Sequence, residues 1–253
     1  MSDRVPELSL IIPAYNEEKR LARALGRIES YFASKPSGIG LDDLEVIVVD
    51  DGSTDATARV AQDWAGRMHA LRVLTGRANR GKGFSVRQGM LEARGRIGLF
   101  TDADLSAPIE ESEKLLAAIR SGKNAAIGSR AMDRSLIAAR QSRLREIAGM
   151  IFNGFVRVFT GLPFQDTQCG FKAFEREPCR IVFEQQRIER FGFDPEILFL
   201  ACRHGLTVEE VPVRWSHDAA TKVHVIRDSL MMFGDLVLIR WNWLIGRYPR
   251  NKR

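Results

Sequence analysis

The most informative segment of the sequence reads Leu99-Phe100-Thr101-Asp102-Ala103-Asp104-Leu105-Ser106. The apolar run from Ile97 to Phe100 predicts a buried strand, and two carboxylates one residue apart follow its end. Since alternate residues of a strand lie on one face, Asp102 and Asp104 point the same way if the extended backbone continues. Two like charges this close repel each other, and a bound divalent cation would relieve the repulsion. The alternative is a solvated turn closed by Pro108.

Strands and helices are predicted to alternate along the first half of the chain. Between the short apolar runs, residues such as Leu21, Leu25 and Ile28 recur at helical spacing. This alternation predicts an α/β fold with a mostly parallel, Rossmann-like central sheet flanked by helices. The predicted strands are 8–12, 44–49, 71–74, 97–100 and 125–127, with a later strand at 208–215.

Polar clusters directly follow several of these strands. Ligands of a parallel α/β sheet bind outside the carboxyl ends of its strands, so the clusters are expected to meet in one site. We also expect Thr54 or Asp55 to cap the helix after the second strand. The clusters are Asn16 with Glu17, Asp50 with Asp51, residues 79–82, and Asp102 with Asp104.

A glycine-bounded loop, 76–82, has the spacing of a phosphate-binding P-loop as far as Lys82. That motif needs Ser or Thr at the next position to hold magnesium, and this chain has Gly83 there. An ATPase-type P-loop is therefore not expected. Two interpretations stay open, a nucleotide contact through Lys82 and the backbone, or a plain glycine turn.

The composition is that of an ordinary globular protein, with 45% hydrophobic and 28% charged residues. Three cysteines without metal-ligand spacing favour a reducing compartment. Charged residues near the N-terminus interrupt any signal-peptide pattern, so we expect a cytoplasmic protein. The net charge is +6, and seven Lys/Arg against two Asp lie in 219–253. Nucleic acid is not an expected partner, because this basic segment has no recognised binding motif.

The second half contains candidate site residues that have two interpretations each. Arginines gather between positions 130 and 145, where they form either a solvated face or a phosphate-binding group. A helix is predicted after them at 147–159. Asp194 either caps the helix that continues to Ala201 or faces the site.

The terminal segment 229–248 is mostly apolar, with Trp241 and Trp243. Charged residues interrupt it, so no run of ~18 uncharged residues exists and no spanning helix is predicted. A helix lying in a membrane interface and a helix packed on the core both explain this pattern.

With these motifs in this order, the sequence resembles the family 2 glycosyltransferases of the GT-A fold, and among them the polyprenyl-phosphate sugar synthases. The resemblance covers about residues 8–246 and implies a catalytic domain, 1–217, and a basic amphipathic C-terminal segment, 218–253, that contacts a membrane surface. The run 166–172 favours the glucosyl branch. The motifs are Ile12-Pro13-Ala14-Tyr15-Asn16-Glu17, Val49-Asp50-Asp51-Gly52-Ser53-Thr54-Asp55, Asn79-Arg80-Gly81-Lys82-Gly83, Thr101-Asp102-Ala103-Asp104-Leu105-Ser106, Gly128-Ser129-Arg130, Asp166-Thr167-Gln168-Cys169-Gly170-Phe171-Lys172 and Phe193-Asp194-Pro195-Glu196.

The resemblance implies transfer of glucose from UDP-glucose to a polyprenyl phosphate, dolichyl or undecaprenyl, with inversion at the anomeric carbon. Pro13, Tyr15 and Glu17 would line the nucleotide pocket together with Asp50. Asp51 would recognise the base.

The same resemblance implies the donor and metal contacts. Asp102 would lie beside the ribose and the diphosphate, and Asp104 would coordinate Mg²⁺ or Mn²⁺ with Asp102 as the second ligand. Ser106 stands where mannosyl relatives have a metal-binding Gln, so it is not expected to be a strong ligand. Lys82 and Arg130 would contact the donor.

The acceptor phosphate would be bound by Arg143, Arg145 and Lys222. A lipid phosphate is already anionic and attacks without a strong general base, whereas a hydroxyl acceptor needs one. Asp166 and Asp194 are the candidate bases. Asp166 is expected to position the acceptor, and neither is expected to be an obligatory base.

Two other functions stay open. One is a glycosyltransferase that uses a soluble or saccharide acceptor. The other is a nucleotide-sugar-binding protein that has lost catalysis, although the intact Glu17, Asp102 and Asp104 argue against it.

Overall fold

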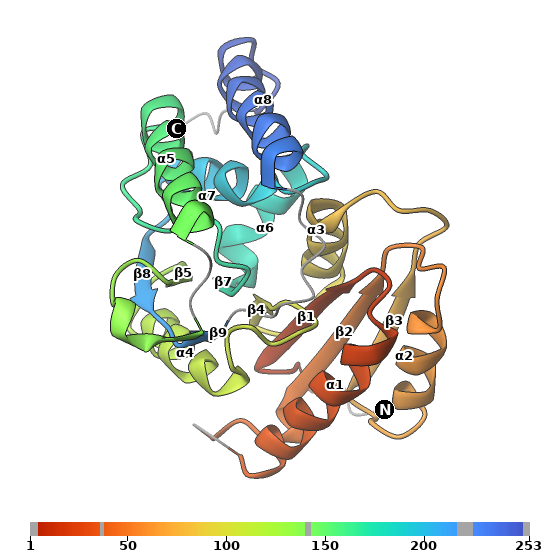
Figure 1. Cartoon of the computed structure of the whole chain (residues 1–253). Helices are drawn as coiled ribbons and strands as arrows, with labels where there is room; N and C mark the ends of the chain where they lie inside the picture. Colours follow the sequence, from red (N-terminus) through yellow and green to blue (C-terminus); the bar gives the residue numbers. More distant parts are fainter. Residues whose placement is uncertain (1–4, 36–37, 140–142, 217–224, 250–253) are drawn as a thin grey trace.

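The computed structural model describes residues 5–35, 38–139, 143–216 and 225–249. Its centre is a seven-stranded sheet with the strand order β3-β2-β1-β4-β7-β5-β8 (Figure 1). A separate two-stranded sheet pairs β6 with β9. The strands are β1 (Leu8–Ala14), β2 (Leu44–Asp50), β3 (Leu71–Thr75), β4 (Ile97–Phe100), β5 (Ala125–Ser129), β6 (Ile137–Ala139), β7 (Lys172–Glu175), β8 (Val208–Pro212) and β9 (Trp215–Ser216).

The parallel register aligns the ends of β1, β2 and β4 at one edge of the sheet. Ala14 lies opposite Asp50, and Ile11 lies opposite Phe100. All residues of β2 are buried because helices cover both faces of the sheet, which explains its mostly apolar sequence. The residues that follow these strands, including Asp102, therefore meet at this edge.

Strand β7 is not predicted by the sequence and runs against both of its neighbours. Lys172 pairs with Phe100 of β4 and with Ile127 of β5. Because β7 is antiparallel, its first residue lies where the parallel strands end. The preceding loop, 163–171, is thereby brought to the same edge as Asp102. The other pairings of the large sheet are parallel, which confirms the predicted α/β fold.

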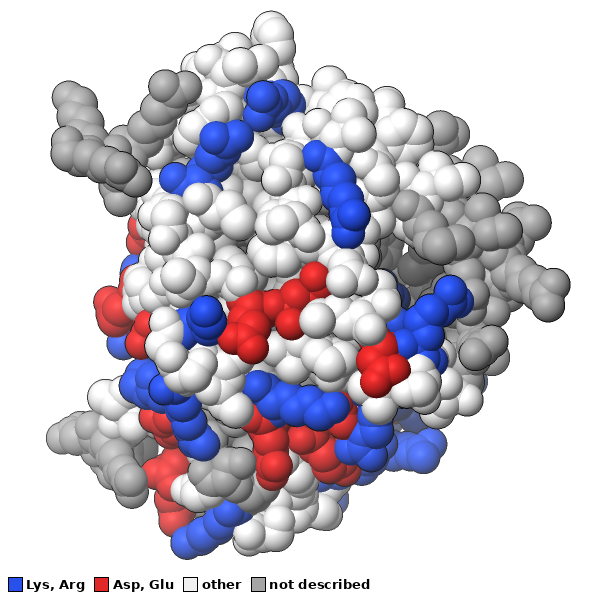
Figure 2. All heavy atoms as spheres, turned by 90° about the vertical axis from the view of Figure 1, so that its left-hand side faces the viewer, with Lys and Arg blue, Asp and Glu red and all other residues white. Residues whose placement is uncertain are grey.

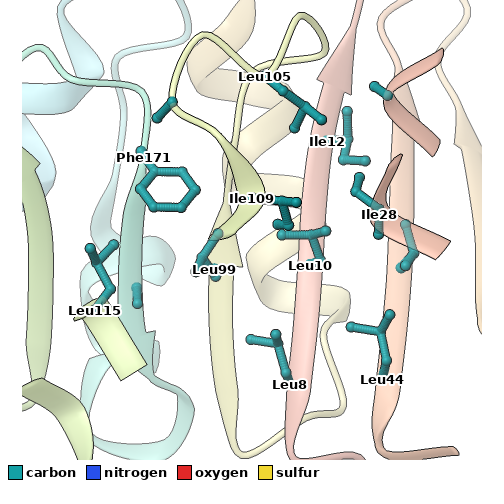
Figure 3. Packing of buried hydrophobic residues seen from close by; sticks show 14 of the residues in the cluster. Leu8, Leu10, Ile12, Ile28, Leu44, Leu99, Leu105, Ile109, Leu115 and Phe171 are labelled. Atoms are coloured by element: carbon teal, nitrogen blue, oxygen red, sulfur yellow. The ribbon is translucent and has the colours of Figure 1, made fainter. Parts of the chain in front are cut away.

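Helices cover both faces of this sheet. Helices α1, α2 and α4 pack on one face, in the core cluster that contains Leu10 and Ile12 of β1 (Figure 3). Helices α3 and α5 to α8 pack on the other face, around Ile11. The alternation follows from the two-residue period of a strand. The helices are α1 (Glu18–Ala33), α2 (Thr57–Ala65), α3 (Lys82–Glu92), α4 (Ser112–Arg120), α5 (Arg143–Thr160), α6 (Arg176–Gln185), α7 (Phe193–Arg203) and α8 (Val225–Leu244).

The C-terminal helix α8 has one buried and one exposed face. Leu236 and Ile239 are fully buried in the second core cluster. Tyr248, after the helix, is also fully buried, and its hydroxyl donates a 2.6 Å hydrogen bond to Oε1 of Glu196 in α7. The segment is therefore packed on the core, whereas its contact with a membrane stays a prediction. The apolar side chains exposed on α8 include Met231, Phe233, Val237, Leu238, Trp241 and Leu244.

No helix within the described ranges has the length and apolar character needed to cross a membrane. Figure 1 shows α5 and α8 side by side at the end of the molecule far from α1 and α2. Phe233 of α8 packs edge-on against Phe155 and Phe159 of α5. These ring contacts join the two helices into one surface.

The predicted helix cap after β2 is wrong. Helix α2 begins at Thr57 and is preceded by Ala56, so neither Thr54 nor Asp55 is its N-cap residue. Asp55 lies one residue earlier and accepts a 2.9 Å hydrogen bond from the Thr57 N–H. The Ala56 N–H donates instead to Oε2 of Glu18, in α1, at 3.1 Å. A side chain distant in the sequence thus completes the helix end.

The prediction of one continuous strand over 208–215 is wrong, because the segment forms two separate strands, β8 and β9. Its first part, β8, pairs with β5 of the large sheet and ends at Pro212, which has no N–H group to continue the ladder. Its last part, β9, pairs with Ile137 and Ala139 of β6. Because Pro212 pairs with Ser129, the chain leaves the large sheet next to the segment that begins at Arg130.

Candidate active site

The end of β1 carries three predicted nucleotide-binding residues, Pro13, Tyr15 and Glu17, and all three are partly buried. Between them, Asn16 adopts a left-handed backbone with φ of 54°. Its N–H donates a 2.9 Å hydrogen bond to Oγ of Ser53, in the loop after β2. The loops after β1 and β2 are therefore fixed to each other, and the three residues lie beside the predicted Asp50–Asp51 cluster.

Asp50 and Asp51 are almost completely buried at the end of β2. Asp51 accepts hydrogen bonds from the N–H groups of Arg80 and Gly81 at 3.0 and 2.7 Å. Burial raises the pKa of Asp51, and these two donors oppose the increase. Asp50 accepts a 3.3 Å bond from the Ser53 N–H. Both carboxylates thus hold the surrounding loops, and their contact with a nucleotide stays a prediction.

The Asp102 segment turns instead of continuing as a strand. Leu105 has a φ of 50°, and Asp104 accepts a 2.9 Å hydrogen bond from the N–H of Ser106. The extended backbone therefore does not continue past β4, so the condition for the two carboxylates to point the same way is not met, and the Asp104 side chain helps to close a turn. The two carboxylates nevertheless lie close together. Burial, followed by the charge of Asp102, raises the pKa of Asp104.

Lys82 is the counterion of the Asp102 carboxylate in this turn. Its Nζ lies 2.5 Å from Oδ1 of Asp102, and the backbone of Gly170 approaches both groups so closely that a Cβ at that position would clash with Asp102 Oδ2. Lys82, at the end of the glycine-bounded loop, is the first residue of α3. This position places its side chain at the carboxyl edge of the sheet. A contact of Lys82 with a nucleotide stays a prediction.

The donor set of Asp102 and Asp104 fits a hard divalent cation. The side chains keep 38% and 19% of their surface exposed, so both remain accessible. Burial and the charge of Asp102 raise the pKa of Asp104, and a bound cation would offset both effects. Within the described residues there is no group of three or more His, Cys, Asp or Glu side chains that could hold a metal ion. This set suits Mg²⁺ or Mn²⁺, which use one or two carboxylates with phosphate oxygens and water.

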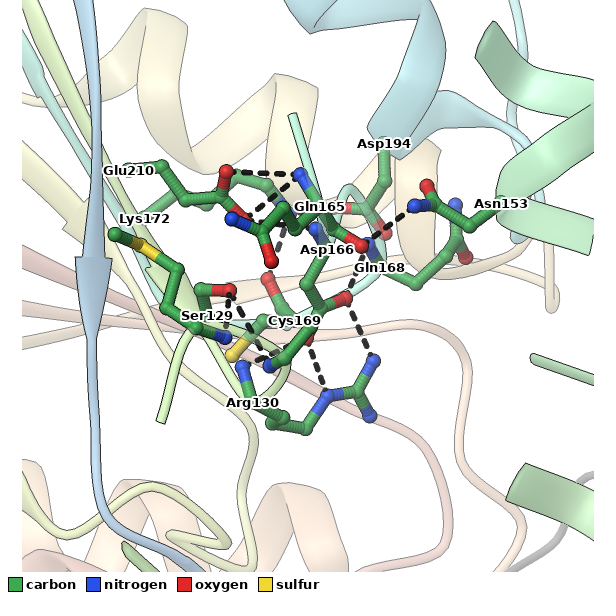
Figure 4. A network of polar contacts seen from close by, with 12 residues as sticks. Ser129, Arg130, Asn153, Gln165, Asp166, Gln168, Cys169, Lys172, Asp194 and Glu210 are labelled. Carbon is green, nitrogen blue, oxygen red and sulfur yellow. Dashed lines mark hydrogen bonds and ion pairs between the residues drawn. The ribbon is translucent and has the colours of Figure 1, made fainter. Parts of the chain in front are cut away.

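Asp166 forms a closed ion pair with Arg130 (Figure 4). Nε and Nη2 of Arg130 donate to its two oxygens at 2.7 and 2.9 Å, and the Arg130 N–H adds a 3.0 Å bond. Despite burial, Arg130 lowers the pKa of Asp166 to about 2. The N–H of Asp166 in turn donates to Glu210 of β8 at 2.8 Å. Asp166 thus fixes Arg130 through these bonds, and its expected part in positioning the acceptor stays a prediction.

Asp194 is paired with Lys172 inside the protein. Lys172 is fully buried, donates to Oδ1 of Asp194 and gives a 2.6 Å bond to the carbonyl of Cys169. Its Nζ lies 5.4 Å from the centre of the Phe100 ring. Gly192 precedes α7, so the interpretation of Asp194 as a helix cap is wrong. The pair anchors β7 to α7 directly beneath the loop that holds Asp166.

The predicted acceptor residues are only partly covered by the structure. Arg143 and Arg145 belong to the first turn of α5, and nothing is described of their side chains. Lys222 lies outside the described residues. Their contact with an acceptor phosphate therefore stays a prediction.

A cavity of about 430 Å³ lies between α5, the segment after β5 and the loop before β7. Arg130 and Asp166 form one wall, which connects the cavity to the site described above. Arg134, one of the arginines that the sequence gathers between positions 130 and 145, also lines it. Sequence reasoning missed Arg157, which lies within α5 and belongs to no motif. The lining also includes Ile137, Phe152, Asn153, Thr167, Gln168 and Trp215.

Comparisons with known proteins agree with this geometry. The family profile described as "Glycosyl transferase family 2" matches residues 9–183. A dolichyl-phosphate beta-glucosyltransferase of Drosophila melanogaster is 40% identical over 250 residues, which cover 96% of this chain and 77% of that protein. The protein of the same name from Homo sapiens is 34% identical over 250 residues, with the same shares of both chains.

Solved structures share the fold at lower sequence identity. One is glucosyl-3-phosphoglycerate synthase from Mycobacterium tuberculosis in complex with Mn²⁺, UDP-glucose and phosphoglyceric acid, with a TM-score of 0.64 and 19% identity over 98% of this chain and 81% of that chain. Another is a mannosyltransferase from Pyrobaculum calidifontis in complex with GDP-mannose and Mn²⁺, with a TM-score of 0.59 and 20% identity over 96% of this chain and 65% of that chain. These neighbours support the predicted GT-A architecture.

Proposed function

The chain belongs to glycosyl transferase family 2, and from that membership we propose that it transfers glucose from UDP-glucose to a polyprenyl phosphate, with inversion and with a divalent metal ion. The observation that carries the proposal is the accessible pair Asp102 and Asp104 at the carboxyl edge of the sheet. Similarity over 96% of this chain to proteins named dolichyl-phosphate beta-glucosyltransferase supports the choice of donor and acceptor.

On the donor side, Asp104 and Asp102 would hold Mg²⁺ or Mn²⁺, which supplies Lewis-acid compensation for the charge that develops on the leaving UDP. Pro13, Tyr15 and Glu17 would contact the nucleotide from the end of β1. Lys82, which is paired with Asp102, has the charge and position to contact the diphosphate.

On the acceptor side, a phosphate oxygen of the acceptor attacks C1 of glucose. The bond between C1 and the UDP oxygen breaks on the opposite side, and the configuration at C1 inverts. Because the phosphate is already anionic, no proton has to be removed. This suits the low pKa of Asp166, about 2, which leaves that carboxylate unable to accept a proton at neutral pH. Arg143, Arg145 and Lys222 are the proposed phosphate contacts.

We further propose that the protein works at the cytoplasmic surface of a membrane, with the exposed face of α8 against the lipid. Trp241 and Leu244 are 56% and 64% exposed there, and apolar residues exposed in this way mark interaction sites. The double variant Trp241→Ser/Leu244→Ser should lose most binding to anionic liposomes in a flotation assay. Val5→Ser is the matched control. Val5 has the same exposed fraction as Leu244, 64%, but lies near the start of the sequence, outside α8. Equal binding of both variants would contradict this contact.

The transfer itself is tested with radiolabelled UDP-glucose, polyprenyl phosphate and Mn²⁺ or Mg²⁺, followed by extraction into organic solvent. We expect label in the lipid phase and its loss with EDTA. Metal-dependent UDP-glucose binding without lipid labelling would contradict the acceptor assignment and favour a soluble acceptor. Absence of both would contradict the donor assignment as well.

A further inference from the structure

The motif that contains Asp194 ends in a buried glutamate that the proposed function does not use. Glu196, in the first turn of α7, is fully buried. Its carboxylate accepts hydrogen bonds from the N–H groups of Arg187 and Ile188, at 3.0 and 2.8 Å. The hydroxyl of Tyr248 is a third donor, at 2.6 Å. Because a buried carboxylate is costly without such donors, Glu196 and these three groups hold one another in place.

The two N–H groups belong to the strap, residues 186–192, which connects α6 to α7 and lies against the C-terminal segment. Nη2 of Arg187 donates a 2.9 Å hydrogen bond to the carbonyl of Arg247. At the other end of the strap, the N–H of Gly192 donates to the carboxylate of Asp235, in α8. A Cβ on Gly192 would clash with this carboxylate. The strap is therefore held both by α8 and by the chain that follows it.

The strap also holds the beginning of α3. The N–H of Phe84 donates a 2.9 Å hydrogen bond to the carbonyl of Glu189. Nε2 of Gln186 donates to the carbonyl of Gly83 at 2.8 Å. A Cβ on Gly83 would lie 2.6 Å from the carbonyl oxygen of Ile188, so glycine is needed for this close approach. The first turn of α3 is thus bonded directly to the strap.

This first turn carries the cation of the candidate site. Lys82 begins α3, and its Nζ lies 2.5 Å from Oδ1 of Asp102. The N–H groups of Arg80 and Gly81, just before the helix, bind Asp51. A shift of the first turn would therefore change both carboxylate contacts. The strap thus helps to determine where the charge of Lys82 lies relative to Asp102.

The same connection extends to the apolar surface of α8. Figure 2 shows that the upper part of the molecule, where α5 and α8 lie in Figure 1, is mostly white with separate Lys/Arg patches. On α8, Phe233 and Trp241 are 37% and 56% exposed. The helix that we propose to contact lipid is therefore joined to the first turn of α3 through Tyr248, Glu196 and the strap.

We propose that Glu196 and Tyr248 are positioning residues for the donor. They hold the strap against α3, so that Lys82 lies where it contacts the diphosphate of UDP-glucose. The docked C-terminal segment is thereby required for tight donor binding. The proposal rests on the proposed function, because it takes UDP-glucose as the donor.

Titration calorimetry with UDP-glucose and Mn²⁺ measures the effect without turnover. Glu196→Ala should weaken binding by at least about tenfold, since Lys82 loses its support. Glu196→Gln should stay within about threefold of the wild type, because its amide accepts from the strap and donates to the Tyr248 hydroxyl. The matched control is Glu177→Ala, which removes a 73% exposed glutamate of α6 and should bind like the wild type. Equal affinity of Glu196→Ala and the wild type would overturn the proposal.

A double-mutant cycle separates positioning from a loss of stability. In a Lys82→Met background, Glu196→Ala should weaken UDP-glucose binding by less than about twofold further, because both changes act through the same cation. Fully additive losses would show that Glu196 does not act through Lys82 and would overturn the proposal. Ile28→Val trims a fully buried side chain of α1 in the other core cluster. It is the control for destabilisation alone and should keep the wild-type affinity.

Hydrogen exchange tests the strap without any ligand. Glu196→Ala should speed the exchange of the amides of residues 80–85 by at least about fivefold more than that of the amides in β1. Tyr248→Phe, which removes one of the three donors, should have a smaller effect in the same direction. It replaces Glu196→Ala in every measurement if that variant does not fold.

The two readouts distinguish this proposal from the proposed function. Faster exchange at 80–85 in the variants, without UDP-glucose binding by the wild type, would keep the positioning contacts and overturn the proposed donor. Unchanged exchange at 80–85 in the folded variants, with UDP-glucose binding and lipid transfer by the wild type, would overturn the positioning role and keep the function.

Discussion

The two sides of the site differ in charge. The carboxylate side, formed by Asp50, Asp51, Asp102 and Asp104, lies at the ends of β2 and β4. The arginine side, formed by Arg130, Arg134 and Arg157, lies between the segment after β5 and helix α5. A carboxylate cluster attracts a divalent cation, whereas a guanidinium cluster attracts a phosphate. Under the proposed function, the carboxylate side would bind the metal-bound diphosphate and the arginine side the phosphate acceptor.

The two sides also differ in how they are built. On the carboxylate side, short motifs place each residue directly after a strand, and the Ser106 N–H binds Asp104 locally. The N–H groups that bind Asp51 come from Arg80 and Gly81, 29 and 30 positions along the chain. On the arginine side, Arg130 is held by Asp166, which lies 36 residues away, and Asp166 is held by Glu210 across another 44. The position of the carboxylates after their strands therefore follows from local sequence, although tertiary contacts hold Asp51 and Asp102, whereas the arginine side depends on tertiary contacts throughout. The predictions below test this difference.

The largest effect is expected on the carboxylate side. Asp104→Ala should lower turnover by about 10³-fold, because a metal ion contributes several kcal/mol of charge stabilisation. UDP-glucose binding should lose its dependence on Mn²⁺, whereas prenyl phosphate binding and the fold should remain. Calorimetry with each ligand and circular dichroism measure these outcomes. Asp63→Ala, at an exposed position of α2, is the control, and unchanged UDP-glucose affinity and turnover in Asp104→Ala would contradict the metal site.

A stability effect is expected on the arginine side. Arg130 lowers the pKa of Asp166 from 3.8 to about 2, so the folded state favours the ionised form. This difference stabilises the protein by about 2 kcal/mol above pH ~4, and the contribution disappears as the pH falls toward 2. Asp166→Asn should remove it, lowering the free energy of unfolding at pH 7 and flattening its decrease between pH 4 and 2.

Urea unfolding of the wild type and of Asp166→Asn over this pH range measures the difference. Asp63→Asn serves as the control for loss of a carboxylate at an exposed position. Parallel pH curves for the wild type and Asp166→Asn would show that the ion pair does not stabilise the arginine side. Metal-dependent UDP-glucose binding should be retained in the variant at pH 7.

The smallest effect is expected where the C-terminal segment joins the core. Tyr248→Phe removes the hydrogen bond to buried Glu196 and should lower the free energy of unfolding by about 1.5 kcal/mol. Tyr31→Phe removes a 3.0 Å bond to Glu113 at the surface and should cost less. Urea unfolding of both variants provides the comparison. Equal losses would show that Tyr248 is not a specific anchor of the segment after α8.

Much of the fold could be predicted, because the parallel strands are buried on both faces and appear in the sequence as continuous apolar runs. The runs at β1, β2 and β4 are recognisable in this way, and their polar ends identify the carboxylate side. Strand β7 could not be predicted, since its four residues, Lys172–Glu175, include two charges and only one register of the sheet places Lys172 beside Asp194.

The residues of the candidate site also divide into those that the sequence predicts and those that only the structure brings together. The sequence alone identified Asp102, Asp104 and Lys82 as neighbours of a strand end, since spacing along a strand is a local property. Whether the strand continued through Asp104 depended on the turn at Leu105, which tertiary packing determines.

The sequence by itself therefore determined the α/β class, the family and the carboxylates that follow the strands, because each depends on residues within one turn or one strand. Only the tertiary structure determined that Asp166 is bound to Arg130, that Tyr248 anchors the chain after α8, and that Arg134, Arg157 and Gln168 line one cavity. These residues meet across dozens of positions in the chain. Their contacts arise from the register of the sheet and from the packing of helices on it, which no local pattern encodes.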